Sequence, residues 1–266
     1  MTRPGELLIE IDGAAATAED MWPALGGYGH FTAMQVRGGR VRGLDFHLAR
    51  LDGATRELFG TGLDGERVRG HIRHALGGWG GPDGDASVRV NVFRPVDAPG
   101  SPVAVLVAVR PPATVAPGPK RVKSVPYQRP VAHLKHTGGF GQGYYIRQVE
   151  AEGYDEALLV GPGGEIAEGA VTNLGLIDGG TVVWPDAPYL HGIAMQVLER
   201  ELGRAGVPMT RRPVLVTDLG GYGGAFLANS RGLSPIAAVD GTELPLDAEL
   251  LGRVMELYEA APWDVI

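Results

Sequence analysis

The amino-acid sequence predicts a mixed α+β protein built from two domains. Short apolar strand patterns alternate with helix patterns in both halves of the chain. Residues 111–120 (PPATVAPGPK) carry four prolines and no apolar periodicity, a composition typical of a linker. The length of 266 residues suits one large domain or two of moderate size, each able to bury a core. We therefore predict a first domain over 1–112, a linker over 113–120 and a second domain over 121–266.

The first domain is predicted to combine a sheet with two helices. Asp45 is expected to cap the first helix, because an aspartate side chain can accept a hydrogen bond from the first turn. A Gly-Gly pair after the second strand indicates a hairpin. The expected strands cover 6–12, 30–36, 87–93 and 102–109, and the expected helices cover about 46–58 and 64–77.

The second domain is predicted to be richer in strands, and no internal repeat is visible. Its expected strands cover 121–127, 156–160, 173–177, 181–184, 225–228 and 234–239. Its expected helices lie near 144–152, 191–205 and 246–260.

The bulk composition excludes several classes of protein. No apolar run approaches the roughly 18–20 residues of a membrane span, and we expect no cleaved leader because no basic-then-apolar segment opens the chain. The absence of cysteine excludes disulfides and thiolate metal sites, so we expect a cytoplasmic protein without a metal. A net charge of −7 without a basic tract argues against a nucleic-acid partner.

Four segments carry the residues that suggest chemistry. In the first, HLKHTGGFGQGYY (133–145), Lys135 lies beside two histidines and just before closely spaced glycines. Most lysines are solvated surface charges. In a partly buried site, however, the pKa of the ammonium group falls, and this gives the free amine that imine chemistry requires.

The other three segments are unremarkable when each is taken alone. Residues 154–177 suggest a hairpin with Glu168 at a bend, and residues 225–241 suggest a strand, a small polar turn and a second strand. In 189–207, a glycine precedes an amphipathic helix, and the backbone N–H groups at a helix start can bind an anion.

Taken together, the order and spacing of these segments resemble the class IV aminotransferases, the fold-type IV pyridoxal-phosphate enzymes. This family includes branched-chain and D-amino-acid aminotransferases and aminodeoxychorismate lyase. The resemblance runs from about residue 26 to 241. Residues 27–51 resemble the family segment that ends in a His-x-x-Arg-Leu helix. The anchors in the second half are Lys135, Gly153–Ala157, the Glu168-Gly169-x-x-x-Asn173 turn, Gly192-Ile193 and Ser234-Pro235. The resemblance implies a small N-terminal domain, a larger β-barrel-like C-terminal domain with helices, and a cofactor in the cleft between them.

The resemblance assigns the central chemistry to two residues. Lys135 matches the Schiff-base lysine of the family, and Glu168 matches the acid that pairs with the pyridine nitrogen of pyridoxal 5'-phosphate. An anionic carboxylate keeps that nitrogen protonated, which makes the ring an electron sink. A lysine displaced by the substrate amine can carry the proton between the substrate Cα and the cofactor C4′.

The resemblance also implies a site for the cofactor phosphate. Arg50 matches a phosphate-binding arginine, and a guanidinium suits a phosphate dianion through bidentate hydrogen bonds. Ile193 and Ala194 match backbone donors at a helix start, although relatives often carry threonine in place of Ala194. Ser230 matches the residue that closes the phosphate site, and Asn173 is a further cofactor-binding candidate.

Three residues are candidates for substrate binding. Phe140 lies where transaminating relatives often carry a tyrosine, and a phenyl ring cannot donate a hydrogen bond. Phe31 is expected to line the substrate pocket. Arg94 lies near the position of a substrate-carboxylate arginine in some relatives, and an exposed charge at a strand end is the alternative.

The leading functional hypothesis is a pyridoxal-phosphate-dependent aminotransferase that moves an amino group between an amino acid and a keto acid in ping-pong fashion. A lyase of the aminodeoxychorismate type, which releases pyruvate by β-elimination, is the first alternative. A non-catalytic protein that keeps the fold is the second, and retention of both Lys135 and Glu168 argues against it. The resemblance further implies a homodimer.

Overall fold

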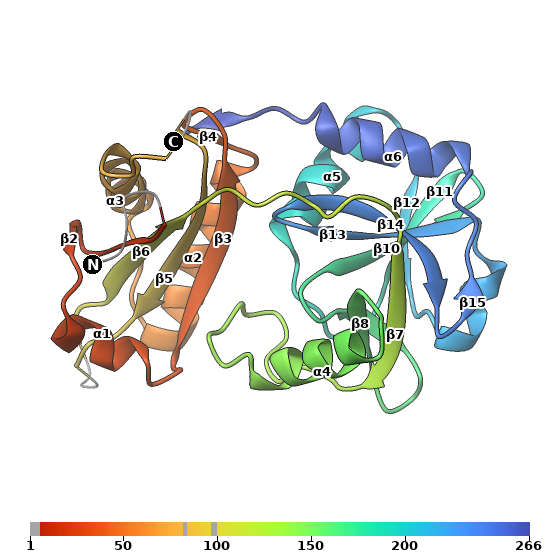
Figure 1. The fold of residues 1–266 in the computed structure, drawn as a ribbon, viewed down its shortest axis with the longest axis horizontal. Helices are drawn as coiled ribbons and strands as arrows, with labels where there is room; N and C mark the ends of the chain where they lie inside the picture. Colours follow the sequence, from red (N-terminus) through yellow and green to blue (C-terminus); the bar gives the residue numbers. More distant parts are fainter. Residues whose placement is uncertain (1–5, 82–83, 97–99) are drawn as a thin grey trace. The chain divides into compact units, whose positions relative to one another are not determined.

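The computed structural model describes residues 6–81, 84–96 and 100–266. Residues 1–5, which bear on the expected absence of a leader, lie outside this description. The chain forms two compact units (Figure 1). Unit 1 comprises Met1–Ala113, Leu134–Gly138 and Pro262–Ile266, and unit 2 comprises Thr114–His133 and Gly139–Ala261. Within the described part of the chain, no helix is both long and apolar enough to cross a membrane.

Unit 1 is built on an antiparallel five-stranded sheet with strand order β2-β1-β6-β5-β3. Helices α2 (Leu44–Phe59) and α3 (Gly65–Gly77) pack on one face of the sheet through a cluster of buried apolar side chains. Helix α1 (Ala18–Ala24) packs against the other face. The strands are β1 (Leu8–Ile11), β2 (Ala14–Ala15), β3 (Gly29–Val36), β5 (Ala86–Phe93) and β6 (Ala104–Arg110).

The two faces of this sheet follow from alternation in the sequence. Along β3 and β5, every second side chain is buried, since successive residues of a strand point to opposite faces. Met34, Val88 and Val90 belong to the core beneath α2 and α3. The residues between them, such as Phe31 and Arg89, lie on the opposite face and are only half-buried.

The predicted cap of α2 is wrong. The helix begins at Leu44 after Gly43, whose φ of 67° suits a glycine, and Asp45 lies inside the first turn. The N–H of Leu44 instead donates to the carboxylate of Asp264 at 3.0 Å. The donor and the acceptor are 220 residues apart, so local sequence reasoning could not find this cap.

Two short segments that are distant in sequence join unit 1 through strand pairing. Strand β16 (Asp264–Val265) pairs with β4 (Arg40–Val41). Residues 134–138 extend along β3, where Phe31 N–H donates to the Lys135 carbonyl at 2.9 Å and His30 pairs with His136. The unpaired backbone groups of an edge strand favour such additions. Lys135 therefore belongs with the N-terminal half of the chain.

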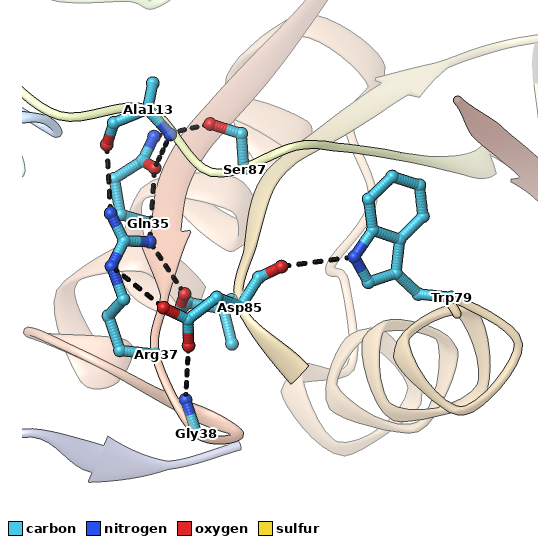
Figure 2. Close-up of polar contacts among 8 residues, drawn as sticks. Gln35, Arg37, Gly38, Trp79, Asp85, Ser87 and Ala113 are labelled. Carbon is cyan, nitrogen blue, oxygen red and sulfur yellow. Dashed lines mark hydrogen bonds and ion pairs between the residues drawn. The ribbon is translucent and has the colours of Figure 1, made fainter. Parts of the chain in front are cut away.

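The point at which the chain leaves unit 1 is held by a polar network on β3 (Figure 2). The Ala113 N–H donates to Gln35 Oε1 at 2.8 Å, and Arg37 Nη2 donates to the Ala113 carbonyl at 3.0 Å. Arg37 also forms an ion pair with Asp85 at 3.5 Å, and Gly38 N–H donates to the same carboxylate at 3.0 Å. The predicted linker is thus anchored at its start.

Unit 2 is built on a nine-stranded mixed sheet with the order β12-β11-β10-β13-β14-β7-β8-β9, and β15 pairs with β14. The sheet curls, so that β9 also approaches β10 and β11. The curled sheet agrees with the barrel-like second domain that the sequence predicted. The strands are β7 (Lys120–Pro126), β8 (Glu156–Val160), β9 (Ile166–Gly169), β10 (Asn173–Asp178), β11 (Thr181–Pro185), β12 (Met209–Arg212), β13 (Gly224–Asn229), β14 (Gly232–Val239) and β15 (Thr242–Glu243).

Three α-helices belong to unit 2: α4 (Phe140–Ala151), α5 (Ile193–Arg204) and α6 (Glu249–Glu259), together with a 3₁₀ helix over Val216–Gly221. Helix α4 begins four residues before the predicted start. Glycine has low helix propensity, so the Gly-rich run did not predict a helix start at Phe140. Packing requires glycine there, because a Cβ at Gly141 would lie 2.4 Å from the Tyr127 ring.

Candidate functional site

The candidate lysine of unit 1 lies beside an aromatic ring. The chain contains three lysines, Lys120, Lys123 and Lys135. Lys135 is half-buried, and its Nζ lies 4.9 Å from the centroid of the Phe31 ring, within the range of a cation–π interaction. By contrast, Lys123 forms an ion pair with Glu152, which raises the pKa of its ammonium group and keeps it protonated.

A buried histidine lies near the two candidate cations of unit 1. His47 is on α2, one turn before Arg50, and its Nδ1 is 2.6 Å from the hydroxyl of Thr32 on β3. Burial, together with the charges of Arg50 and Lys135, lowers the pKa of His47 to about 3. His47 is therefore neutral at physiological pH. The region around it is electropositive, which suits an anionic group such as a phosphate.

The candidate acid of unit 2 is a buried and anchored carboxylate. Glu168 lies on β9 with 4% of its surface exposed. Its Oε1 accepts from Arg129 Nε at 2.8 Å, and its Oε2 accepts from the Leu190 N–H at 3.0 Å. A buried carboxylate with a guanidinium and an N–H donor keeps both its charge and its orientation. Sequence reasoning did not select Arg129, and its only local signal was a position six residues before Lys135.

Asn173 fixes the loop that leads into helix α5. The Asn173 side chain donates to the Leu190 carbonyl at 2.7 Å, so both backbone groups of Leu190 are engaged, one by Asn173 and one by Glu168. Gly192 is the N-cap residue of α5, and a Cβ there would lie 2.0 Å from Asn173 Oδ1. Glycine at this position lets the loop approach Asn173 closely.

The remaining phosphate-site candidates lie at the same end of the unit 2 sheet. Ile193 and Ala194 form the first turn of α5, where Gly192 provides no side-chain cap for the backbone N–H groups. Ser230 follows β13, in which Ala228 is paired with Asn173. Asn173 thus links the first turn of α5 to the end of β13 that leads into Ser230.

A second buried carboxyl group supports the turn after Glu168. Glu156 on β8 accepts from the Ala157 N–H at 3.0 Å and from the Thr172 hydroxyl at 3.3 Å. Burial, partly offset by hydrogen bonds, raises the pKa of Glu156 to about 7. The sequence indicated Glu156 only as part of the family resemblance. The structure shows that it contacts the turn leading to Asn173.

The three substrate-binding candidates lie in different surroundings. Phe31 is on β3 beside Lys135. Arg94 donates to the Phe59 carbonyl at 2.7 Å, and its guanidinium lies 5.1 Å from the Phe59 ring centroid. Phe140, in unit 2, is 86% exposed and stacks on Tyr144. Their roles stay predictions. In residues 6–81, 84–96 and 100–266, no group of three or more His, Asp or Glu side chains is placed to hold a metal ion.

A comparison with known protein families shows to which family this chain belongs. The family model for amino-transferase class IV matches residues 29–239, which include every candidate site residue named above. This chain belongs to the class IV aminotransferase family. Membership confirms the resemblance found in the sequence and with it the expected cofactor, pyridoxal 5'-phosphate. A comparison with curated proteins gave no match.

Solved structures of similar fold include both transferases and a lyase. A branched-chain aminotransferase from Thermoproteus uzoniensis has a TM-score of 0.84 and 20% identity, over 96% of this chain and 94% of that one. A pyridoxal-phosphate-bound hypothetical aminotransferase from Mycobacterium tuberculosis has a TM-score of 0.82 and 21% identity, over 96% and 98%. The 4-amino-4-deoxychorismate lyase from Pseudomonas aeruginosa has a TM-score of 0.78 and 27% identity, over 94% and 97%. The class IV fold is therefore confirmed, and both reactions occur among the similar structures.

Proposed function

We propose that this class IV family member is an aminotransferase that moves an amino group between an amino acid and a keto acid. Lys135 is the amine that holds the cofactor, and Glu168 pairs with the cofactor ring nitrogen. The observation that carries the proposal is the environment of Lys135. It is half-buried beside Phe31 and close enough to His47 to lower the pKa of that imidazole.

The residues of both units suit pyridoxal phosphate. Arg50 contributes to the electropositive region around His47, as a phosphate group requires. The first turn of α5, with Ile193 and Ala194, offers backbone N–H groups, and Ser230 offers a hydroxyl. The family resemblance matches each of these residues to a phosphate-binding position, and we propose that role for each of them.

Each chain residue then has a chemical task. When bound, the cofactor supplies an electron sink that stabilises negative charge at the substrate Cα. Glu168, kept anionic by Arg129, holds a proton at the ring nitrogen. Lys135 Nζ, once displaced by the substrate amine, would carry the proton between the substrate Cα and the cofactor C4′. Asn173 keeps the loop before α5 in place through Leu190.

A spectroscopic half-reaction tests this proposal. The cofactor-loaded protein is mixed with single L- and D-amino acids in the absence of a keto acid, and the cofactor absorbance is followed. We expect at least one amino acid to convert the pyridoxal form to the pyridoxamine form, with release of its keto acid. A protein that binds the cofactor but is converted by no amino acid would contradict the transferase assignment.

A lyase is the second candidate, favoured by one observation. The Pseudomonas aeruginosa lyase is 27% identical to this chain, against 20% and 21% for the two aminotransferases compared above. The distinguishing assay supplies aminodeoxychorismate to the loaded protein. Pyruvate release without formation of the pyridoxamine form supports the lyase, whereas formation of the pyridoxamine form by amino acids supports the transferase.

We further propose amino acids and keto acids as substrates, a homodimer as the assembly and the cytoplasm as the location. The family resemblance supports the dimer, and the absence of cysteine from the chain is compatible with a reducing compartment. Light scattering of the loaded protein at several concentrations tests the dimer. A constant molar mass near 28.0 kDa, that of one chain, would contradict it.

A further inference from the structure

Unit 2 contains two buried carboxyl groups, those of Glu156 and Glu168, on the neighbouring strands β8 and β9. Glu168 is paired with Arg129, whereas Glu156 accepts only from neutral donors. No cationic side chain of the described residues forms an ion pair with Glu156 or contributes to its pKa. Burial of a charge without a counter-charge is costly, and carboxyl groups perturbed in this way concentrate at functional sites. The groups that Glu156 contacts show what it does in the fold.

The turn between Glu168 and Asn173 closes around Glu156. Residues 169–172 connect β9, which carries Glu168, to β10, which begins at Asn173. Glu156 Oε2 accepts from the hydroxyl of Thr172, within this turn, at 3.3 Å. The contact therefore acts on the short segment that separates two candidate cofactor-binding residues.

The turn is packed tightly against Glu156 and its strand. A Cβ on Gly169 would lie 2.0 Å from Thr172 Oγ1 and 3.3 Å from Glu156 Cγ. The Ala157 N–H donates to Glu156 Oε1 at 3.0 Å, and the Ala157 carbonyl accepts from the Ala170 N–H at 2.9 Å. The turn is thus linked to β8 through both a side chain and the backbone.

The ionised form of Glu156 suits this environment chemically, although burial opposes it. Burial raises the pKa of Glu156 to about 7, even though hydrogen bonds from Ala157, Thr172, Val171 and Ala170 favour the charged form. An ionised carboxylate accepts from all of these donors, whereas a protonated carboxyl must place its own hydrogen among them. Ionisation therefore tightens the turn at a cost in folding stability.

The charged residues that flank Glu156, on β7 or in sequence, are Arg121, Lys123 and Asp155. Lys123 forms an ion pair with Glu152, and Asp155 accepts from the Arg121 N–H at 2.8 Å. The turn over 169–172 carries no charged residue. The titration of Glu156 therefore acts on the turn and not on a neighbouring charge.

We propose that Glu156 is a positioning residue of the cofactor site, whose carboxylate holds the 169–172 turn and thereby fixes Glu168 and Asn173. The proposal rests on the proposed function, in which Glu168 meets the cofactor ring nitrogen. Glu168 accepts from the Leu190 N–H at 3.0 Å, and Asn173 donates to the Leu190 carbonyl at 2.7 Å. Movement of the turn would therefore displace both residues together with the loop before α5.

The variant Glu156→Gln tests the proposal, because the amide has the shape of the protonated carboxyl group but does not titrate. The cofactor-free protein is titrated with pyridoxal 5'-phosphate at pH 8.5 and pH 5.5, above and below the pKa of about 7. The dissociation constant of the variant is then divided by that of the wild type. Titrations of the cofactor and of other residues cancel in this ratio, because they occur with both proteins.

The expected ratio depends on pH. At pH 8.5 we expect the variant to bind the cofactor about 10-fold more weakly, as loss of a hydrogen bond to a charged group predicts. At pH 5.5 Glu156 of the wild type is itself protonated, so we expect the two dissociation constants to agree within about twofold.

Folding stability distinguishes positioning from packing. An acid whose pKa is raised by folding loses stability as the pH rises from its unfolded to its folded pKa. Glu156→Gln removes this loss, so we expect its urea midpoint, relative to that of the wild type, to increase from pH 5.5 to pH 8.5. Its relative cofactor affinity decreases over the same interval. A side chain that only packed the fold would change stability and affinity in the same direction at both pH values.

Two further variants complete the design. Glu150→Gln changes an exposed glutamate on α4 and is expected to match the wild type in affinity and stability at both pH values. Thr172→Val removes the hydroxyl donor but keeps the Glu156 carboxylate, and it also serves if Glu156→Gln does not fold. We expect Thr172→Val to weaken cofactor binding about 3- to 10-fold at pH 8.5. In the double variant we expect no loss beyond that of Glu156→Gln, because the two side chains act through one contact.

The outcomes separate this proposal from the proposed function. A ratio of dissociation constants that is equal at the two pH values refutes the positioning role of the Glu156 carboxylate, while the proposed function stands. The same holds if Thr172→Val adds its full effect to that of Glu156→Gln. A wild-type protein that binds no cofactor at either pH overturns the proposed function and this proposal with it.

Discussion

At the residue scale, the least expected feature is the buried pair of Arg129 and Glu168. Each side chain is almost fully buried, and Glu168 also accepts from a backbone N–H. Removal of one partner leaves a buried charge without compensation, which typically costs about 3–5 kcal/mol. The pair therefore keeps Glu168 ionised and oriented as well as contributing to stability.

Replacement of Arg129 by leucine tests this role. We expect Arg129→Leu to lower the free energy of unfolding by about 3–5 kcal/mol and to weaken pyridoxal-phosphate binding. Urea denaturation and cofactor titration measure the two effects. Arg204→Leu is the control, because Arg204 forms an exposed pair with Glu201 and should change stability by less than about 1 kcal/mol. Equal effects of the two substitutions would contradict the assignment.

The buried His47 predicts how stability depends on pH. Its folded pKa of about 3 lies below the ordinary histidine value of 6.5. Between these values the unfolded chain binds a proton that the folded chain does not, so stability is lost as the pH falls below about 6.5. At about 1.4 kcal/mol per pKa unit, acidification from pH 7 to pH 5 removes about 2 kcal/mol through this residue.

The variant His47→Asn isolates that contribution. Asparagine keeps a polar atom near the Thr32 hydroxyl but does not titrate. We expect the loss of unfolding free energy between pH 7 and pH 5 to be about 2 kcal/mol smaller than in the wild type. His30, whose pKa burial lowers to about 4, and Glu156, whose pKa burial raises to about 7, titrate in both proteins, so their contributions cancel in this comparison. An identical pH dependence in variant and wild type would exclude His47 as its source.

At the element scale, the start of α5 depends on a close approach that only glycine permits. A Cβ on Gly192 would lie 2.0 Å from Asn173 Oδ1 and would displace the side chain that holds Leu190. Such overpacking typically costs about 1–3 kcal/mol. The first turn of α5 would move with the loop, and the proposed phosphate contacts with it.

Two glycine-to-alanine variants within one element test this. Gly192→Ala is expected to lower the unfolding free energy by about 1–3 kcal/mol and to weaken cofactor binding. Gly203→Ala, near the C-terminal end of α5, meets nothing within 4 Å and is expected to raise stability by up to about 1 kcal/mol. Thermal denaturation and cofactor titration of the apoprotein give both quantities. If Gly192→Ala binds the cofactor as the wild type does, the loop does not hold the phosphate site.

The elements also show where sequence reasoning succeeds and where it stops. Alternation over 30–36 and 87–93 predicted strands that match β3 and β5 closely, because one face of each strand is buried. The hairpin predicted over 154–177 corresponds to β8 and β9, but Glu168, which was expected at a bend, lies inside β9. Its four residues lack an alternating pattern because all four are buried.

The sequence likewise identified only part of the candidate site. The order and spacing of the family motifs identified Lys135, Glu168 and Arg50, because each of these residues lies at a particular position within a motif. Arg129 was not selected, since its importance comes from a tertiary partner, the Glu168 carboxylate. Only the fold brings these two residues together.

At the scale of the whole molecule, the chain distributes the candidate groups over both compact units. Lys135 is the clearest case, because it follows the linker in sequence yet pairs with β3 of unit 1. The assignment of the cofactor to this lysine is the central claim. Only two other lysines compete with it, Lys120 and Lys123, and both are on β7 of unit 2.

Mass spectrometry after borohydride reduction tests that claim most directly. Reduction makes the covalent link between cofactor and lysine permanent, and digestion then locates the added mass. We expect one pyridoxyl-phosphate group per chain on the peptide containing Lys135, and no label in Lys135→Ala loaded and reduced in the same way. Label on Lys120 or Lys123, or labelled Lys135→Ala, would contradict the account.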